Sequence, residues 1–122
     1  MDAPLRHTLP KAEKLCGKTA VSTLLDKGRY VTAGCLRVCF RTSEGEERSR
    51  ILISVPKRNF KRAVKRNLLK RRIRESYRLQ KSLLDTPCDL MFVYTPREVL
   101  PSADIFASMT EALAAVGRAA KR

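Results

Sequence analysis

The chain has 122 residues, of which 26 are Lys or Arg and 12 are Asp or Glu, so its formal net charge is +14. This length suits one domain with a modest core, and an apolar fraction of 43% is typical of a globular protein. No apolar run is long enough to span a membrane and no signal peptide is visible, which predicts a cytoplasmic protein without a membrane partner. A charge this positive indicates a polyanionic partner.

The chain begins with a segment rich in proline and then turns helical. We expect residues 1–10 to be a mobile tail of a single domain that covers 1–122. Apolar residues at helical spacing predict a first helix over 11–27, and Gly28 supplies the stop at its end.

Two strands are predicted next. Apolar and polar residues alternate over 30–41 and again over 48–55, and the acidic cluster 43–47 lies between them. We expect these strands to form an antiparallel hairpin, with a short extra pairing near Tyr30.

The second half of the chain predicts a helix, a strand and a final helix. No Gly or Pro interrupts residues 62–84, so a long helix is expected there. The continuous apolar run 89–95 predicts a central strand. Ser102 is a plausible N-cap for a last helix over 102–119. A sheet with helices packed on it belongs to the α+β class.

Nearly half of the basic residues lie between 57 and 81, where Glu75 is the only acid. Four of them recur at every fourth position of the predicted helix: Arg66, Lys70, Arg74 and Arg78. A ladder with a step of roughly 6 Å can follow consecutive phosphates. A merely solvated face is disfavoured because like charges four residues apart repel each other. A membrane-surface helix is disfavoured because its apolar side lacks Trp and Phe.

Protein-borne catalysis finds no support in the sequence. The four cysteines, Cys16, Cys35, Cys39 and Cys88, form no CxxC pair, and His7 is the only histidine, so a zinc site is unsupported and reduced, mostly buried thiols are expected. No Gly-rich phosphate loop, acid pair or nucleophile–base spacing is present. The sequence therefore predicts binding rather than catalysis by side chains.

Residues 63–78, AVKRNLLKRRIRESYR, resemble the signature of the protein subunit of bacterial ribonuclease P. In that family a basic helix carries an Arg-Asn, a Lys-Arg and an Arg-Glu pair at fixed spacing, which here are Arg66-Asn67, Lys70-Arg71 and Arg74-Glu75. The surroundings also match, with a leading helix that ends at Gly28, the SVPK sequence at 54–57 and an apolar strand after the helix. The resemblance covers about residues 13–118.

The resemblance implies both a fold and a function. The implied fold is α-β-β-(β)-α-β-α, a two-layer sandwich with a left-handed βαβ crossover like that of a ribosomal-protein domain. The implied function is to assist a catalytic RNA in the endonucleolytic removal of 5′ leaders from precursor tRNA. Magnesium would act at the RNA site and none would be tightly bound by the protein, which is expected to be inactive alone. The implied partners are the catalytic RNA, with one monomeric protein on each, and precursor tRNA.

The resemblance and the charge pattern together give two sets of site residues. The RNA-binding set is Lys57, Arg58, Lys61, Arg62, Lys65, Arg66, Asn67, Lys70, Arg71, Arg74 and Arg78. The candidate leader cleft, between the first helix and the sheet, is formed by Lys18, Val21, Leu25, Tyr30, Arg37 and Phe40.

The sequence departs from the family pattern at three positions. Leu68 stands where many members have Arg, while Val21 and Leu25 stand where many have Phe. Core packing is as good an interpretation of Val21 and Leu25 as contact with a leader, and for Asn67 a local hydrogen bond to the backbone is the alternative to RNA contact.

Two other function classes remain as alternatives. One is a structural RNA-binding protein of the ribosome, which charge alone does not distinguish from the first hypothesis. The other is a DNA-binding module, but Arg and Lys with one Asn offer little for reading base edges.

Overall fold

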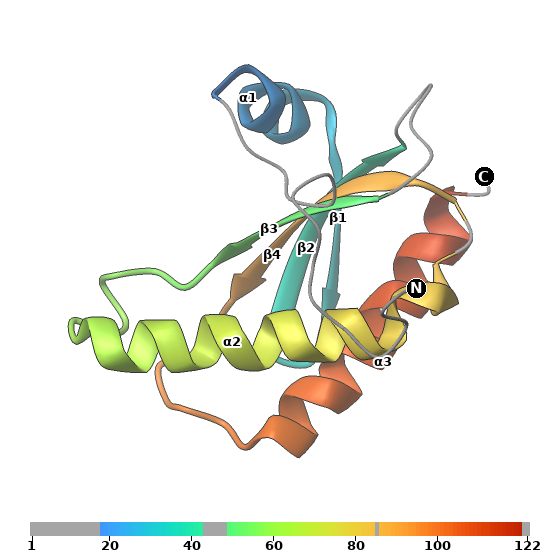
Figure 1. Cartoon of the computed structure of the whole chain (residues 1–122). Coiled ribbons are helices and arrows are strands. Elements are labelled where there is room, and N and C mark those ends of the chain that lie inside the picture. The colour runs from blue at the N-terminus through green and yellow to red at the C-terminus, as the bar shows by residue number, and fades with distance from the viewer. Residues whose placement is uncertain (1–17, 43–48, 85, 121–122) are drawn as a thin grey trace, which may run out of the picture.

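The computed structural model describes residues 18–42, 49–84 and 86–120 (Figure 1). The elements are α1 (Lys18–Lys27), β1 (Arg29–Ala33), β2 (Leu36–Thr42), β3 (Arg50–Ser54), α2 (Ala63–Gln80), the 3-10 turn η2 (Lys81–Leu83), β4 (Cys88–Tyr94) and α3 (Ser102–Ala120). This order confirms the predicted α+β class and includes the additional strand that the sequence left open. The predicted tail and the first part of the first helix lie outside the described residues, so the single-domain boundary stays a prediction.

The four strands form one sheet in the order β1-β2-β4-β3. β2 is antiparallel to both β1 and β4, and β3 is parallel to β4. The predicted central position of β4 is confirmed, but the predicted hairpin between 30–41 and 48–55 is wrong. β4 is apolar on both faces and takes an interior place, which separates β2 from β3. β3, α2 and β4 then form the expected βαβ unit.

The segment predicted as one strand over 30–41 is itself a hairpin. β1 and β2 are joined at Gly34 and Cys35, with Ala33 paired to Leu36. Gly34 has a φ of +54°, and a Cβ on it would lie 2.2 Å from Oγ of Ser108. A two-residue hairpin loop with glycine at its first position is a common solution to this geometry. Gly34 is therefore the turn signal that separates the two strands.

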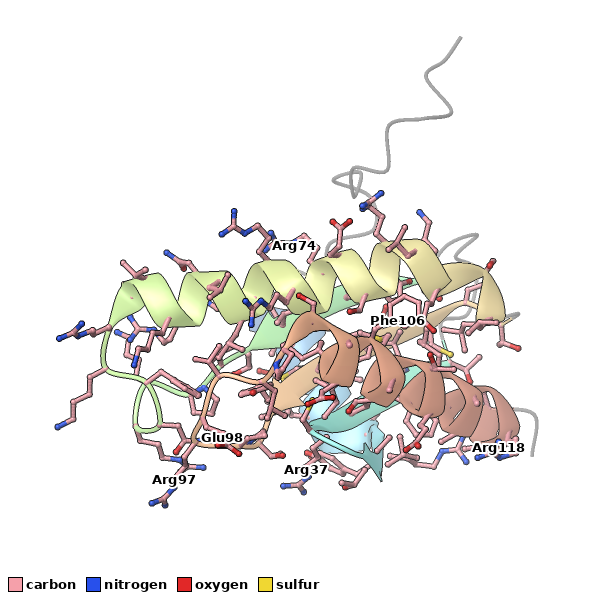
Figure 2. The ribbon with its side chains drawn as sticks, turned by 90° about the horizontal axis from the view of Figure 1, so that it is seen from below. Arg37, Arg74, Arg97, Glu98, Phe106 and Arg118 are labelled. Atoms are coloured by element: carbon pink, nitrogen blue, oxygen red, sulfur yellow. The ribbon has the colours of Figure 1, made fainter. Side chains whose placement is uncertain are left out.

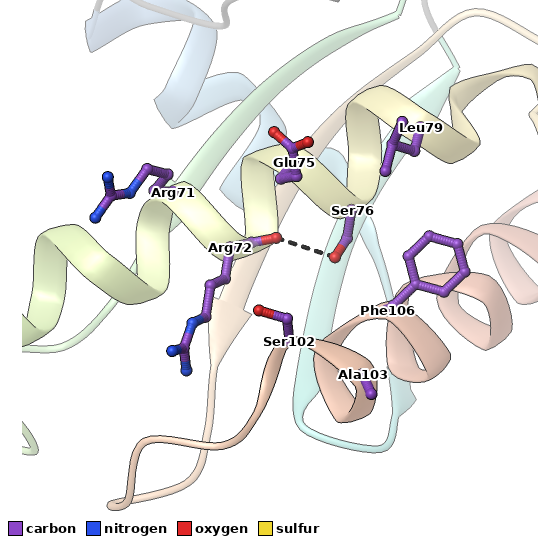
Figure 3. A pocket seen from close by; sticks show the side chains of 8 residues that line it. All are labelled: Arg71, Arg72, Glu75, Ser76, Leu79, Ser102, Ala103 and Phe106. Atoms are coloured by element: carbon purple, nitrogen blue, oxygen red, sulfur yellow. Dashed lines mark hydrogen bonds between the residues drawn. The ribbon is translucent and has the colours of Figure 1, made fainter.

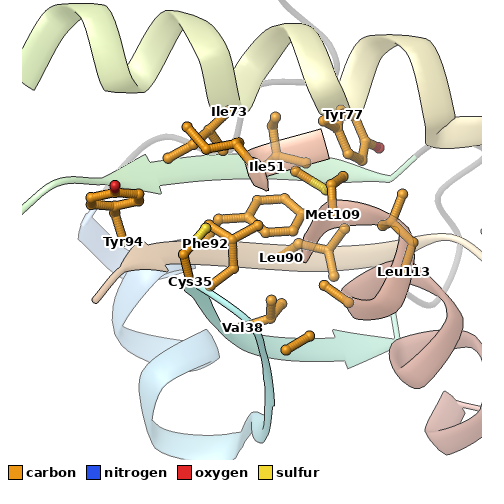
Figure 4. Close-up of a cluster of buried hydrophobic side chains, with 14 of the residues drawn as sticks. Cys35, Val38, Ile51, Ile73, Tyr77, Leu90, Phe92, Tyr94, Met109 and Leu113 are labelled. Carbon is orange, nitrogen blue, oxygen red and sulfur yellow. The ribbon is translucent and has the colours of Figure 1, made fainter. Parts of the chain in front are cut away.

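The main core fills the space between the sheet and the helices α2 and α3 (Figure 4). Its aromatic centre joins Tyr77 of α2 to Phe92 of β4, with ring centroids 5.9 Å apart. The helix packs through Leu69, Ile73 and Tyr77, all fully buried. Leu79 and Leu83 of the same segment are exposed.

The ends of the two long helices differ slightly from expectation. α2 ends at Gln80 and continues as the tighter turn η2, so the regular helix is shorter than the predicted 62–84. The change of period at η2 turns Leu83 away from the buried face. At the start of α3 the carbonyl of Pro101 accepts the N–H of Ile105, so Pro101 rather than Ser102 takes the N-cap position.

α1 covers part of the opposite face of the sheet (Figure 1). Leu24 and Cys39 form a second, smaller buried cluster there, apart from the main core. Gly28 allows this close approach, because a Cβ would lie 2.3 Å from the carbonyl oxygen of Leu24 and 2.7 Å from Sγ of Cys39. The prediction that Gly28 ends the first helix is confirmed.

Three cysteines are buried and free, at positions 35, 39 and 88. This confirms the expected burial for these three, while Cys16 lies outside the described residues. Burial raises the pKa of the Cys88 thiol to about 11. Within the described ranges, no helix is long and apolar enough to cross a bilayer.

Candidate nucleic-acid interface

The predicted RNA-binding residues lie on α2 and on the loop that leads into it. We call their accessible surface the α2 basic face, and it consists of the eleven predicted residues Lys57, Arg58, Lys61, Arg62, Lys65, Arg66, Asn67, Lys70, Arg71, Arg74 and Arg78. All eleven are at least partly exposed. Figure 2 shows Arg74 on the side of α2 that points away from α3. Helical spacing places Arg66, Asn67, Lys70, Arg71, Arg74 and Arg78 on one side of α2, whereas Lys65 lies on the side of Arg72.

Two rungs of the predicted ladder have partners within the protein. Nη1 of Arg66 donates to the carbonyl oxygens of Phe60 at 2.6 Å and Lys61 at 2.9 Å. Arg78 forms an ion pair with Glu75 one turn earlier on α2. Arg66 therefore fixes the loop before α2 against the helix and holds the cations of that loop in place.

The other two rungs, Lys70 and Arg74, have no hydrogen-bond or ion-pair partner among the residues that the structure describes. A cation without a protein partner loses no internal bond when it meets a phosphate. Lys70 and Arg74 are consequently the rungs best placed to neutralise phosphates directly.

Arg72 lies on a different side of α2 from the ladder. Its Nη1 donates to the carbonyl oxygen of Leu100 at 2.7 Å, in the loop before α3. This basic residue therefore ties α2 to the start of α3. Arg72 is not among the predicted RNA-binding residues.

Asn67 is exposed on the α2 basic face. Its side chain makes no hydrogen bond to any part of the chain that the structure describes, so the alternative of a local bond to the backbone finds no support. An amide can donate and accept at once. Asn67 thus offers hydrogen bonds in the middle of a surface that otherwise offers charge.

The second surface is the side of the sheet that α1 only partly covers. We call it the α1–sheet face. Tyr30 of β1 and Arg37 of β2 lie there in contact, with the Arg37 guanidinium carbon 4.5 Å from the centre of the Tyr30 ring. Tyr30 is 47% exposed, which leaves an aromatic surface open to solvent. Val21 is half-buried and Leu25 is exposed on α1.

One of the six predicted cleft residues, Phe40, faces away from α1. Phe40 is only 1% exposed and belongs to the main core on the opposite side of the sheet. Side chains alternate along β2, so Arg37 and Cys39 face α1 whereas Phe40 faces α2 and α3. The prediction for Phe40 is wrong for this reason. The side chain of Lys18 lies outside the described residues.

The floor of the α1–sheet face consists of residues that were not predicted from the sequence. Leu52 and Met91 are half-buried and pack against the Leu24–Cys39 cluster. The strand register places Met91 directly opposite both Cys39 and Leu52. This neighbourhood depends on the order of the strands, and the local sequence signal for it is that β3 and β4 carry apolar residues on both faces.

Two ionisable groups of the α1–sheet face have raised pKa values. A hydrogen bond with Cys39 raises the pKa of the Tyr30 phenol, and burial raises the pKa of the Cys39 thiol. Both groups are therefore neutral at pH 7. At one end of the same face, the carboxylate of Asp89 accepts two hydrogen bonds from Arg50, each 3.0 Å long, which offsets a negative charge that would repel RNA.

Comparison with known proteins connects these surfaces to a family. The model of the family described as Ribonuclease P matches residues 9–117. The chain belongs to this family. The ribonuclease P protein component of Chlorobaculum tepidum is 34% identical over 117 residues, which cover 82% of this chain and 76% of that protein.

A shorter match agrees with the first. The ribonuclease P protein component of Porphyromonas gingivalis strain ATCC 33277 is 39% identical over 87 residues, which cover 70% of this chain. The chain matches about two thirds of the length of that relative, 64%.

Solved structures of the family share the fold. The RNase P protein of Staphylococcus aureus is 25% identical with a TM-score of 0.77, covering 87% of this chain and 96% of that chain. The protein from Thermotoga maritima is 22% identical with a TM-score of 0.74, with the same coverage of 87% and 96%, and supports the fold alone.

Proposed function

We propose that this chain is the protein component of a ribonuclease P ribonucleoprotein. In this role it binds a catalytic RNA and the 5′ leader of precursor tRNA, and assists the endonucleolytic cut that gives the mature 5′ end. The observation that carries the proposal is the α2 basic face. Its signature residues are accessible on one helix, and Lys70 and Arg74 have no partner among the described residues.

In this proposal the two surfaces bind different RNAs. The α2 basic face contacts the catalytic RNA through phosphates, while Asn67 supplies a hydrogen-bonding group at a fixed place on it. The α1–sheet face takes the single-stranded leader. There Tyr30 and Arg37 provide the stacking surface that many family members place on the first helix, since bases stack on aromatic rings and guanidinium planes.

The chemistry of the cut belongs to the RNA in this proposal. Magnesium ions held by the RNA would activate the attacking water and stabilise the leaving oxygen. The described part of the chain holds no group of three His, Cys, Asp or Glu side chains that could bind a metal ion. We further propose one protein for each RNA and a place in the cytoplasm, where precursor tRNA is processed.

Reconstitution tests the proposal. The purified chain, the catalytic RNA from the same source and a precursor tRNA are combined in magnesium. We expect no cleavage by the protein alone and cleavage at the mature 5′ end once the RNA is added. Specific cleavage by an RNA-free preparation would overturn the assignment of chemistry to the RNA. Binding to ribosomal RNA with no affinity for the catalytic RNA would support the ribosomal alternative instead.

A further inference from the structure

A pocket lies between α2 and α3; it shares Arg71 with the α2 basic face and lies apart from the α1–sheet face (Figure 3). Its volume is about 470 Å³, within the range of small-ligand sites. It is lined by Arg71, Arg72, Glu75, Ser76, Leu79, Ser102, Ala103 and Phe106. None of these residues belongs to either buried core cluster.

The two ends of the pocket differ in chemistry. Leu79 and Phe106 lie together at one end, and Arg71 and Arg72 lie toward the other (Figure 3). Leu79 of the basic helix α2 is 51% exposed, and Phe106 of the neighbouring helix α3 is 42% exposed. Core packing therefore does not explain why these two positions are apolar.

Polar groups complete the pocket. Arg71 has no protein partner among the described residues, and Arg72 is fixed through one nitrogen by the Leu100 carbonyl, which leaves its other N–H groups for a ligand. Ser102 offers a hydroxyl at the rim. The carboxylate of Glu75 is paired with Arg78, so it can accept a hydrogen bond without presenting an unbalanced charge.

We propose that this pocket receives one unpaired nucleobase of the catalytic RNA, with the base against Phe106 and Leu79 and its phosphate at the arginine end. The inference rests on the proposed function. A nucleotide has an aromatic face, which matches the ring of Phe106. Its polar edge matches the oxygens of Ser102 and Glu75, and its anionic phosphate matches the guanidinium groups of Arg71 and Arg72. The positive charge beside the pocket favours RNA as the ligand, because the pocket is next to the α2 basic face.

The base must come from a loop, bulge or other unpaired site. In an A-form duplex the bases are stacked inside the helix and their faces are closed to side chains, whereas unpaired bases can be splayed out onto aromatic rings. The pocket would thus read one unpaired position, while the α2 basic face follows the backbone near it.

A pair of charge-matched variants tests the occupancy of the pocket. Ala103→Glu places an added side chain in the pocket, and Ala114→Glu makes the same charge change at an exposed α3 position outside it. Ala103 lies in the first turn of α3, where an acid is favourable, so this variant is expected to fold. We expect Ala103→Glu to weaken binding to the catalytic RNA by about 5- to 150-fold relative to Ala114→Glu, the loss of one stacked base.

A second pair isolates the ring. Phe106→Ala is compared with Leu83→Ala, which removes another exposed apolar side chain outside the pocket, and Phe106→Trp should restore binding. Because Phe106 is uncharged, its removal should leave the salt dependence of binding unchanged. Melting temperatures of all variants separate lost contact from lost fold.

A photo-reactive benzoylphenylalanine in place of Phe106 maps the contact in the assembled particle. A crosslink to one unpaired nucleotide of the catalytic RNA is the expected result. Crosslinks spread over duplex regions, or equal affinities of Phe106→Ala and Leu83→Ala, would overturn the pocket and leave the proposed function standing. No binding of the unmodified protein to the catalytic RNA would instead overturn the proposed function, and the pocket with it.

Discussion

The α2 basic face and the α1–sheet face lie on opposite sides of one sheet, and they are expected to bind RNA through different interactions. The α2 basic face offers many cations and no aromatic ring, so its affinity should come from released counterions and fall steeply with salt. The α1–sheet face offers one exposed ring, one guanidinium and a half-buried apolar floor. Its affinity should come from stacking and depend weakly on salt. A long structured RNA suits the first surface, and a short single strand suits the second.

The largest effect is expected from a substitution that disrupts the α1–sheet face and leaves the α2 basic face intact. A methyl group at Gly28 would lie 2.3 Å from the Leu24 carbonyl oxygen and 2.7 Å from Sγ of Cys39, so Gly28→Ala must push α1 off the sheet. We expect a loss of about 1–3 kcal/mol in the free energy of unfolding, as for other overpacked sites. Leader-dependent affinity for precursor tRNA should fall while affinity for the catalytic RNA is kept.

Gly117→Ala is the matched control for this experiment. Nothing lies within 4 Å of a Cβ at Gly117, and the residue is inside α3. The change should therefore stabilise the protein by about 0.5–1 kcal/mol through helix propensity. Equal thermal stability of the two alanine variants would contradict the packing role of Gly28.

The next prediction tests which basic residues of the ladder on the α2 basic face contact phosphates. Arg74→Ala should weaken binding to the catalytic RNA and flatten the slope of log affinity against log salt by about 0.7–0.9 units, since one phosphate loses its partner. Lys70→Ala should do the same. Arg66→Ala should in addition lower thermal stability, because Arg66 donates to the carbonyls of Phe60 and Lys61.

Arg118→Ala is the control, because Arg118 is an exposed cation near the far end of α3 (Figure 2). It should leave the salt slope as it is. Slopes that stay the same for both Lys70→Ala and Arg74→Ala would show that these rungs face solvent in the complex.

A smaller effect tests stacking on the α1–sheet face. Tyr30→Ala should weaken leader-dependent binding of precursor tRNA by about 5- to 150-fold, the contribution of one stacked base, and leave the salt slope unchanged. Tyr30→Phe keeps the ring and loses only the hydroxyl that bonds Cys39, so it should bind nearly as well. The measurement compares precursor tRNA with mature tRNA. A Tyr30→Phe variant as weak as Tyr30→Ala would assign the effect to the hydroxyl.

Local patterns predicted the helices and the position of the signature residues on α2, but they did not predict the floor of the α1–sheet face, for a physical reason. The helices α2 and α3 follow from spacing within one segment, and the signature residues lie on a single helix, so their grouping needs no tertiary information. The α1–sheet face depends on which strands are neighbours. β4 enters between β2 and β3 from far along the chain, and only that pairing reveals Leu52 and Met91 as the floor.

Two further details needed the structure for similar reasons. Alternation along β2 places Arg37 and Phe40 on opposite faces, and the structure shows that the face of Arg37 is the one that meets α1. The bonds of Arg66 to the preceding loop depend on the path of that loop after Pro56, where the backbone turns before α2. Positive charge in a sequence therefore locates a binding helix but does not separate phosphate contacts from internal braces.

The smallest expected effect separates hydrogen bonding from charge on the α2 basic face. Asn67 is exposed, uncharged and without a hydrogen bond to the described residues. If its amide bonds a fixed group of the RNA, Asn67→Ala loses one net hydrogen bond, about 0.5–1.5 kcal/mol or roughly 2- to 12-fold in affinity. The salt slope should not change, because no counterion is released by a neutral amide. The melting temperature should not fall either, since no internal bond is lost and Ala is the better helix former.

Affinity, salt slope and melting temperature measured on one preparation distinguish this outcome from the alternatives. A flattened slope would mean that Asn67 positions a neighbouring cation, and a lower melting temperature with normal affinity would assign Asn67 to the fold.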